Sequence, residues 1–204
     1  MKSVLISIQP YYVFLIIAKV MGWNIGKRKT VEVRKNFPKD SGWDKRTIIY
    51  CSRDKKSFNQ IPKEYQPLMQ AFLGKIIGEF VCDNIDEYLC KDYDWGDDVS
   101  LEYHISSKEG HKTCLEYDEI KEYGDEKPIY FWHISDLKIY DKPKELSEFY
   151  TFENNIKCEH QKNYYIYPFC ELTNKDRLCR DIKDCPRKRK QITIPPQSWC
   201  YVNT

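Results

Sequence analysis

The chain of 204 residues lacks a long hydrophobic run. At the N-terminus, Lys2 precedes an apolar stretch that reaches Ala18, but Gln9 and Pro10 interrupt it. A membrane-spanning helix needs about 20 consecutive apolar residues, and no stretch approaches that length. An export signal needs an unbroken apolar segment, which this N-terminus does not have. We therefore expect a soluble, cytoplasmic protein with no membrane partner.

The chain also lacks an excess of charge of either sign. Lys and Arg total 33, and Asp and Glu total 31, so the formal net charge is only +2. A general surplus of cations, common in nucleic-acid-binding proteins, is absent. Any surface that binds nucleic acid must therefore come from charges that the fold segregates.

The nine cysteines lack the C-x2-C spacing that makes a zinc site a specific prediction. Their odd number in a mid-sized chain argues against a secreted disulfide scaffold. The segment from Cys158 through Cys170 and Cys179 to Cys185 has few aliphatic residues for a core of its own. A zinc ion bound by these four thiols, with His160 as a substitute ligand, would help that segment fold. Unliganded thiols are the alternative, and the irregular spacing favours them.

Aromatic side chains are abundant, with 16 Tyr and 5 Trp, which argues against disorder and permits stacking surfaces. The length suits one domain with an insertion or a small appendage. Ser3–Ile8 is rich in Val and Ile and predicts a first strand. Pro10 suits the first position of a helix, and apolar residues at spacings of three and four extend that helix over 11–20.

Further strands and short helices alternate along the chain. Strands are predicted at 46–52, 75–83, 128–141 and 197–202, and helices at 63–73, 113–123 and 144–150. Gly78 inside the second of these strands predicts a bulge or a close backbone approach. Glu79 is a carboxylate in the same apolar strand, so it must be paired or lie near the rim. The acidic residues 90–124 read as a solvated insertion, in which Thr113 caps a helix and Glu116 completes a capping box.

The most informative stretch is 26–38, which places five cations and one carboxylate around a short strand. Alternation over 30–35 directs Glu32 and Arg34 to one face of the strand and the intervening valines to the other. Lys29 stands just before the strand begins. In a groove, this cluster would suit phosphate or nucleobase edges. On an open sheet it is a solvated face, and composition alone does not exclude that.

The strand at 128–141 is dominated by aromatic residues in its first half. Tyr130 and Trp132 share one face, and His133 and Ser135 share the other. His133 is either a structural residue or a polar contact in the same groove as Lys29. Trp132 and Tyr130, together with Trp199 further along the chain, could offer rings for base stacking.

Four motifs together resemble the ASCH domain of the PUA-like superfamily. They are Ser7-Ile8-x-Pro10, the stretch from Gly26 to Arg34, Gly78-Glu79-Phe80 and Trp132-His133-Ile134-Ser135-Asp136. They occur in order from residue 3 to about 140, and the whole chain is similar to ASCH proteins of bacteria and their phages. The G-x-K-x-x-E-x-R pattern is fairly specific, although Gly26 stands one residue early.

The resemblance implies an α+β fold in which short helices flank a PUA-like mixed β-barrel. The barrel would span 1–150 with the acidic insertion near 90–124. A Cys-containing, basic appendage at 151–196 would precede the closing strand at 197–204. The family also implies a positively charged cleft beside the first helix and a link to RNA or modified nucleosides.

Some ASCH relatives hydrolyse the amide of N4-acetylcytidine with a lysine, a threonine three residues later and a glutamate on a following strand. Lys29 matches the lysine and Glu79 matches the glutamate, but Glu32 occupies the threonine position. A hydroxyl nucleophile is therefore missing where that chemistry needs it. The catalytic candidates are Lys29, Glu32 and Glu79.

Other relatives are ribonucleases or RNA-binding modules, which do not need the threonine. We therefore predict binding of RNA or single-stranded nucleic acid in a basic cleft. Its residues would be Lys27, Lys29, Arg34, Lys35, Trp132, His133 and Ser135. A hydrolase acting on RNA or a modified cytidine, and a phage-encoded modulator that binds a host protein, are the alternatives.

Overall fold

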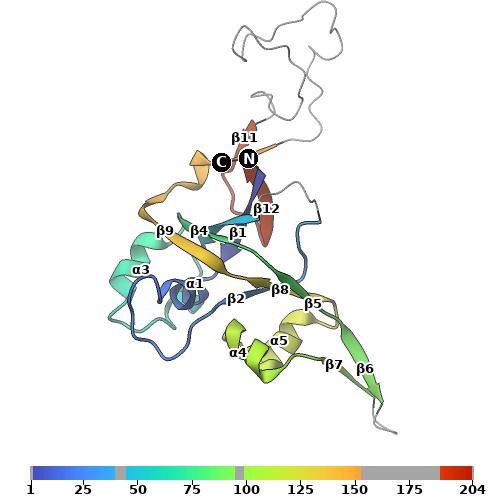
Figure 1. Ribbon diagram of the computed structural model, residues 1–204. Coiled ribbons are helices and arrows are strands. Elements are labelled where there is room, and N and C mark those ends of the chain that lie inside the picture. Colours follow the sequence, from blue (N-terminus) through green and yellow to red (C-terminus); the bar gives the residue numbers. More distant parts are fainter. Residues whose placement is uncertain (1, 40–44, 95–98, 153–188, 204) are drawn as a thin grey trace, which may run out of the picture.

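The computed structural model describes residues 2–39, 45–94, 99–152 and 189–203. Its largest element is a seven-stranded sheet in the order β11-β10-β12-β1-β3-β4-β9. Their bounds are β1 Lys2–Ile8, β3 Arg46–Cys51, β4 Ile76–Val81, β9 Ser135–Lys144, β10 Tyr150–Phe152, β11 Arg189–Gln191 and β12 Trp199–Asn203. β1 pairs in parallel with β3 and antiparallel with β12, so the predicted closing strand lies beside the first strand (Figure 1).

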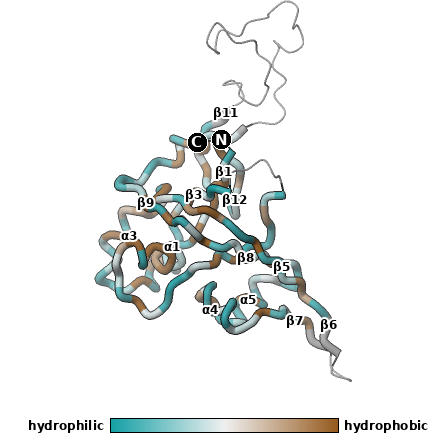
Figure 2. Tube along the Cα trace, viewed as in Figure 1, coloured by the Kyte–Doolittle hydropathy of each residue, from teal (hydrophilic) through white to brown (hydrophobic). Residues whose placement is uncertain are grey.

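The main core lies between this sheet and α1 (Pro10–Ile17). Pro10 occupies the first turn, as predicted, where its missing N–H is not needed. Val13 and Ile17 of α1 are fully buried against the sheet, where Ile6 is also fully buried. Figure 2 shows α1 as one of the most hydrophobic segments of the trace. Two short helices, α2 (Lys55–Phe58) and α3 (Gln66–Phe72), complete this side.

A second sheet has the order β2-β8-β5, with bounds Val31–Arg34, Ile129–His133 and Ile85–Tyr88. The sequence predicted one strand over 128–141, but the chain divides at Ile134 into β8 and β9, which belong to different sheets. The Ile134 amide donates to the Thr30 carbonyl, and Asp136 adopts a positive φ of 45°. The continuous run of β-forming residues carries no signal for this division.

The predicted insertion forms strands and helices in its described residues. It contains the hairpin of β6 (Cys90–Asp94) and β7 (Val99–Tyr103), followed by α4 (Ser107–Thr113) and α5 (Tyr117–Gly124). Ile120 of α5 packs with Val31 and Val33 of β2, so α5 covers one face of the second sheet (Figure 1). The insertion is therefore part of the core.

The helix prediction at 113–123 was wrong at its start. Thr113 ends α4, and Cys114 adopts a left-handed conformation with φ 58° that separates the two helices. α5 begins at Tyr117. Glu116 is its N-cap, and Glu119 completes a second capping box. The T-x-x-E and E-x-x-E patterns overlap, and the chain uses the second.

Gly78 marks both features that the sequence predicted. The register of β4 against β9 shifts between Ile76 and Gly78. A Cβ atom at Gly78 would collide with the Lys138 carbonyl oxygen of β9. The helix predicted at 144–150 reduces to a 3₁₀ turn, Leu146–Glu148, because β9 extends to Lys144.

The described strands form three sheets and no closed barrel among them. No helix in the described ranges is long and apolar enough to span a membrane. Cys158, Cys170, Cys179 and Cys185 lie outside the described residues, so their zinc site stays a prediction.

Candidate functional site

A cluster of charged residues lies where the chain enters β2. The Lys29 amide donates to the Leu15 carbonyl of α1 at 3.2 Å, and the Thr30 amide donates to the Lys112 carbonyl of α4 at 2.9 Å. These bonds hold the approach to β2 between two helices. Val31 and Val33 then bury under α5, so alternation turns Glu32 and Arg34 to the opposite face, as predicted.

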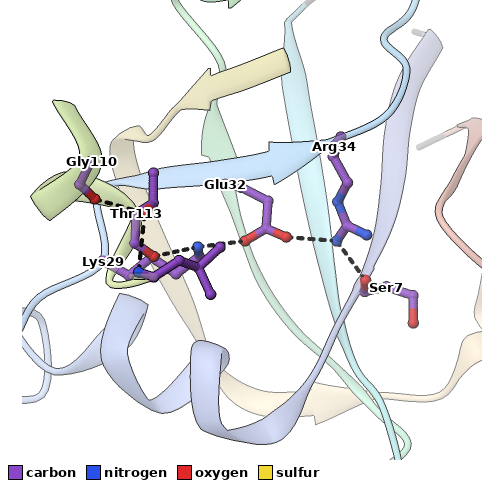
Figure 3. Close-up of polar contacts among 7 residues, drawn as sticks. Ser7, Lys29, Glu32, Arg34, Gly110 and Thr113 are labelled. Atoms are coloured by element: carbon purple, nitrogen blue, oxygen red, sulfur yellow. Dashed lines mark hydrogen bonds and ion pairs between the residues drawn. The ribbon is translucent and has the colours of Figure 1, made fainter. Parts of the chain in front are cut away.

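Lys29, Glu32 and Arg34 form a buried ion trio (Figure 3). Lys29 Nζ lies 3.4 Å from Glu32 Oε2, and Arg34 Nη2 lies 2.9 Å from Glu32 Oε1. The exposed fraction of the side chain is 2% for Lys29, 8% for Glu32 and 9% for Arg34. One carboxylate thus bridges two cations, which leaves the trio with a formal charge of +1.

Backbone carbonyls anchor both cations. Lys29 Nζ donates to the Thr113 carbonyl at 2.7 Å, and Arg34 Nη2 donates to the Ser7 carbonyl at 2.7 Å (Figure 3). Thr113 is the last residue of α4, and the final carbonyls of a helix lack intrahelical partners and attract cations. The insertion therefore supplies part of the site.

Two buried atoms of the trio have no hydrogen-bond partner among the described residues, Glu32 Oε2 and Arg34 Nε. Glu32 Oε2 contacts Lys29 Nζ as an ion pair but outside hydrogen-bond geometry. Buried polar atoms are nearly always hydrogen-bonded, and leaving one unbonded is costly. The trio therefore contains one acceptor and one donor whose hydrogen-bonding capacity the described residues leave unused.

The trio lines a cavity of about 560 Å³, which falls within the range of about 300–1,000 Å³ that is usual for small-ligand sites. The lining residues come from β1, α1, β2 and α5 and the segments that flank them: Ser7, Gln9, Tyr12, Lys29, Glu32, Val33, Arg34, Lys35, Leu115, Glu119, Glu122 and Tyr123. Three are cations and three are carboxylates. The predicted basic cleft is therefore a pocket of balanced charge.

Burial and charge shift the pKa values of three lining residues, and burial raises that of Tyr123. Desolvation lowers the pKa of Lys29, and the Glu32 carboxylate opposes that shift. Desolvation raises the pKa of Tyr12 to about 12, assisted by the charges of Glu119 and Glu32. The Tyr12 ring centroid lies 5.0 Å from Lys29 Nζ, a cation–π contact at the pocket wall.

The structure places Lys29, Glu32, Arg34 and Lys35 in one pocket, as the sequence predicted. Glu79 does not line it. Glu79 pairs with Ile48 across β3 and β4, and Ile48 packs in the core cluster that contains no α1 residue. Its carboxylate accepts a hydrogen bond from the Tyr140 hydroxyl at 2.8 Å. Glu79 is thus separated from Lys29 by the sheet.

The predicted binding residues of 128–141 do not line the pocket either. Trp132 is fully buried and has no exposed ring face for a base. His133 contacts Asp86 at 2.7 Å, and the Ser135 hydroxyl donates to the Val81 carbonyl at 2.9 Å. Lys27 pairs with Glu116 of the α5 cap at 3.3 Å.

Five pocket residues escaped the sequence analysis: Tyr12, Leu115, Glu119, Glu122 and Tyr123. Tyr12 is on the predicted first helix, but helical periodicity singles out its apolar neighbours instead. Glu119, Glu122 and Tyr123 are on α5, which the sequence assigned to a solvated insertion. The second capping box was the available signal for that helix.

No family model matches the chain, and no curated protein matches it. The chain is similar to solved structures of an ASCH protein from Zymomonas mobilis. The ASCH structure itself is 16% identical, with coverage of 98% of this chain and 87% of that chain and a TM-score of 0.47. Two single-substitution variants give TM-scores of 0.47 and 0.42. The first variant is 16% identical, with coverage of 98% of this chain and 88% of that chain. The second is 18% identical, with coverage of 72% of this chain and 77% of that chain. The ASCH domain is also the family that the sequence motifs resemble.

Proposed function

We propose that this chain binds an unpaired base of RNA or of another single-stranded nucleic acid, or a modified nucleoside, in the pocket of the ion trio. The observation that carries the proposal is the pair of unbonded buried atoms, Glu32 Oε2 and Arg34 Nε. A nucleobase edge presents hydrogen-bond donors and acceptors side by side, and carboxylate and guanidinium groups are common partners for such edges.

Tyrosine rings support a base in this pocket. Tyr12 is half-buried and Tyr123 is 38% exposed, and both line the cavity. Aromatic rings stack on unpaired bases whatever the base, worth roughly 1–3 kcal/mol per base. These two tyrosines replace Trp132 as the proposed stacking rings.

The depth of the trio favours unpaired ligands. Each trio side chain is at least nine-tenths buried, so only a group that enters the pocket can reach it. A base within a duplex would have to leave its stack to do so. The exposed Lys35 at the pocket is suited to a phosphate outside the cavity.

A second candidate is hydrolysis of a modified base, and the lowered pKa of Lys29 favours it. Burial lowers the pKa of Lys29, and a lowered pKa favours the role of a buried lysine as a base or nucleophile. The hydroxyl that amide-hydrolysing relatives use is missing, because Glu32 stands three residues after Lys29. The nearby Thr113 hydroxyl donates to the Gly110 carbonyl at 2.7 Å and is fully buried. We therefore rank binding first.

The test is a titration of short single-stranded RNAs of each base composition by fluorescence anisotropy, with Arg34→Lys as the matched variant. Lysine keeps the positive charge but removes Nε–H together with the Nη2 group that binds Glu32 and Ser7, so we expect affinity to fall by roughly 1–3 kcal/mol. Incubation of wild type with N4-acetylcytidine tests the second candidate. Release of acetate that Lys29→Met abolishes would favour the enzyme, and unaltered RNA affinity in Arg34→Lys would contradict the binding proposal.

A further inference from the structure

The two sides of the pocket carry opposite charge. On the β2 side, the exposed Lys35 lines the cavity just after the strand ends, and its Nζ lies 5.3 Å from the ring centroid of Tyr123 on α5. On the α5 side, the exposed carboxylates Glu119 and Glu122 line the cavity. Lys27 is paired with Glu116, whereas neither Glu119 nor Glu122 forms an ion pair within the described ranges. Both therefore present negative charge to a ligand without an ion-pair partner among the described residues.

Glu119 is held in place by the α5 capping box. Its Oε2 accepts the Glu116 amide at 2.8 Å, which fixes the carboxylate at the start of the helix. Glu119 and Tyr12 of α1 line the same cavity, and the charge of Glu119 contributes to the raised pKa of Tyr12. A fixed carboxylate repels an anion more effectively than a mobile one, because it cannot move away at low cost.

We infer that Glu119 and Glu122 make α5 an acidic wall that excludes phosphate from one side of the pocket. The inference rests on the proposed function. A bound single strand then carries its phosphates at the Lys35 end of β2, away from Glu119 and Glu122. The base reaches the trio, and the nucleic-acid backbone stays away from the two carboxylates.

The wall also explains how a pocket of balanced charge binds a polyanion such as a nucleic acid. The trio alone carries +1, which would attract any small anion, including free phosphate. With Glu119 and Glu122 at its edge, a phosphate that enters meets two like charges, whereas an uncharged base does not. The wall therefore selects for the base over the phosphate of the same ligand.

The test compares two ligands and two double variants. The ligands are a single-stranded RNA octamer and its methylphosphonate analogue, which has the same bases and an uncharged backbone. The wall variant is Glu119→Gln with Glu122→Gln, and the first of these substitutions keeps the capping box because glutamine also accepts the amide. The control is Glu64→Gln with Glu126→Gln, which removes the same charge at two exposed positions that do not line the pocket.

We expect the wall variant to bind the charged octamer roughly three- to tenfold more tightly than wild type at low salt, because like-charge repulsion at an exposed site is lost. Its affinity for the uncharged analogue should not change, and the control should match wild type with both ligands. An equal gain for both ligands, or no gain, overturns the inference and leaves the proposed function standing. Failure of wild type to bind either ligand overturns both.

Discussion

At the scale of single residues, the ion trio is the most unusual feature of this protein. Lys29, Glu32 and Arg34 are all at least nine-tenths buried, although charged residues are rarely buried without pairing. The free-energy cost of removing three charges from water can exceed the free energy gained from their mutual attraction. Buried ion pairs are therefore weak sources of stability. Perturbed charges inside a cavity are typical of sites that bind or react.

Glu32 is the member on which the other two depend. In Glu32→Gln, the two buried cations lose their shared counter-charge, and we expect a loss of about 3–5 kcal/mol in the free energy of unfolding. Urea unfolding measures this loss, with the exposed Glu64→Gln as the control, which should stay within about 0.5 kcal/mol of wild type. A Glu32→Gln protein as stable as wild type would show that the trio is not a coupled unit.

At the scale of elements, the approach of β4 and β9 depends on Gly78. In Gly78→Ala the new Cβ would meet the Lys138 carbonyl oxygen, and one strand must shift. We expect a loss of about 1–3 kcal/mol in unfolding free energy.

Gly26 provides the comparison for Gly78. It belongs to the ASCH-like motif, but a Cβ there meets nothing within 4 Å and its φ is not positive. Thermal unfolding of Gly26→Ala should therefore resemble wild type. Equal losses for the two variants would contradict the account of the β4–β9 contact.

Buried thiols at the ends of β3 and β4 make stability fall at alkaline pH. Burial raises the pKa of Cys51 and of Cys82 from 9.0 to about 12. Above pH 9 the unfolded chain releases these protons while the folded chain retains them, so unfolding becomes easier as pH rises toward 12. The two thiols together should cost roughly 2 kcal/mol between pH 9 and 10.

Denaturant unfolding at several pH values between 8 and 10 checks this effect. Cys51→Ala with Cys82→Ala should show a flatter dependence on pH than wild type, whatever its absolute stability. Parallel curves for the two proteins would assign the alkaline loss to other groups.

At the scale of the whole molecule, the near-neutral charge sets the dependence of binding on salt. The balanced pocket and the few cations at its edge allow two or three phosphate contacts. For a single strand, this predicts a slope of log affinity against log salt of about −1.4 to −2.1. Titrations between 50 and 300 mM salt measure it, and a slope near −5 would place the nucleic acid on a surface other than this pocket.

Local patterns predicted the elements around the site better than their arrangement. Alternation placed Glu32 and Arg34 on one polar face, and Pro10 set the start of α1, because both follow from backbone geometry. The faces of Glu79 and Trp132 depend on which sheet each strand joins, and that is decided by packing of distant segments. The role of α5 was missed because most of its residues are polar or acidic. The one buried aliphatic side chain, Ile120, is too weak a signal to predict that the helix packs on a sheet.

The most direct test of the central claim follows the Arg34 Nε–H group itself. In ¹⁵N-labelled protein its NMR signal can be assigned by its loss in Arg34→Lys and then monitored during titration with single-stranded RNA. If the pocket holds a base, this signal should shift progressively, with the same dissociation constant as anisotropy gives. RNA binding that leaves the Arg34 Nε–H signal unmoved would contradict the account.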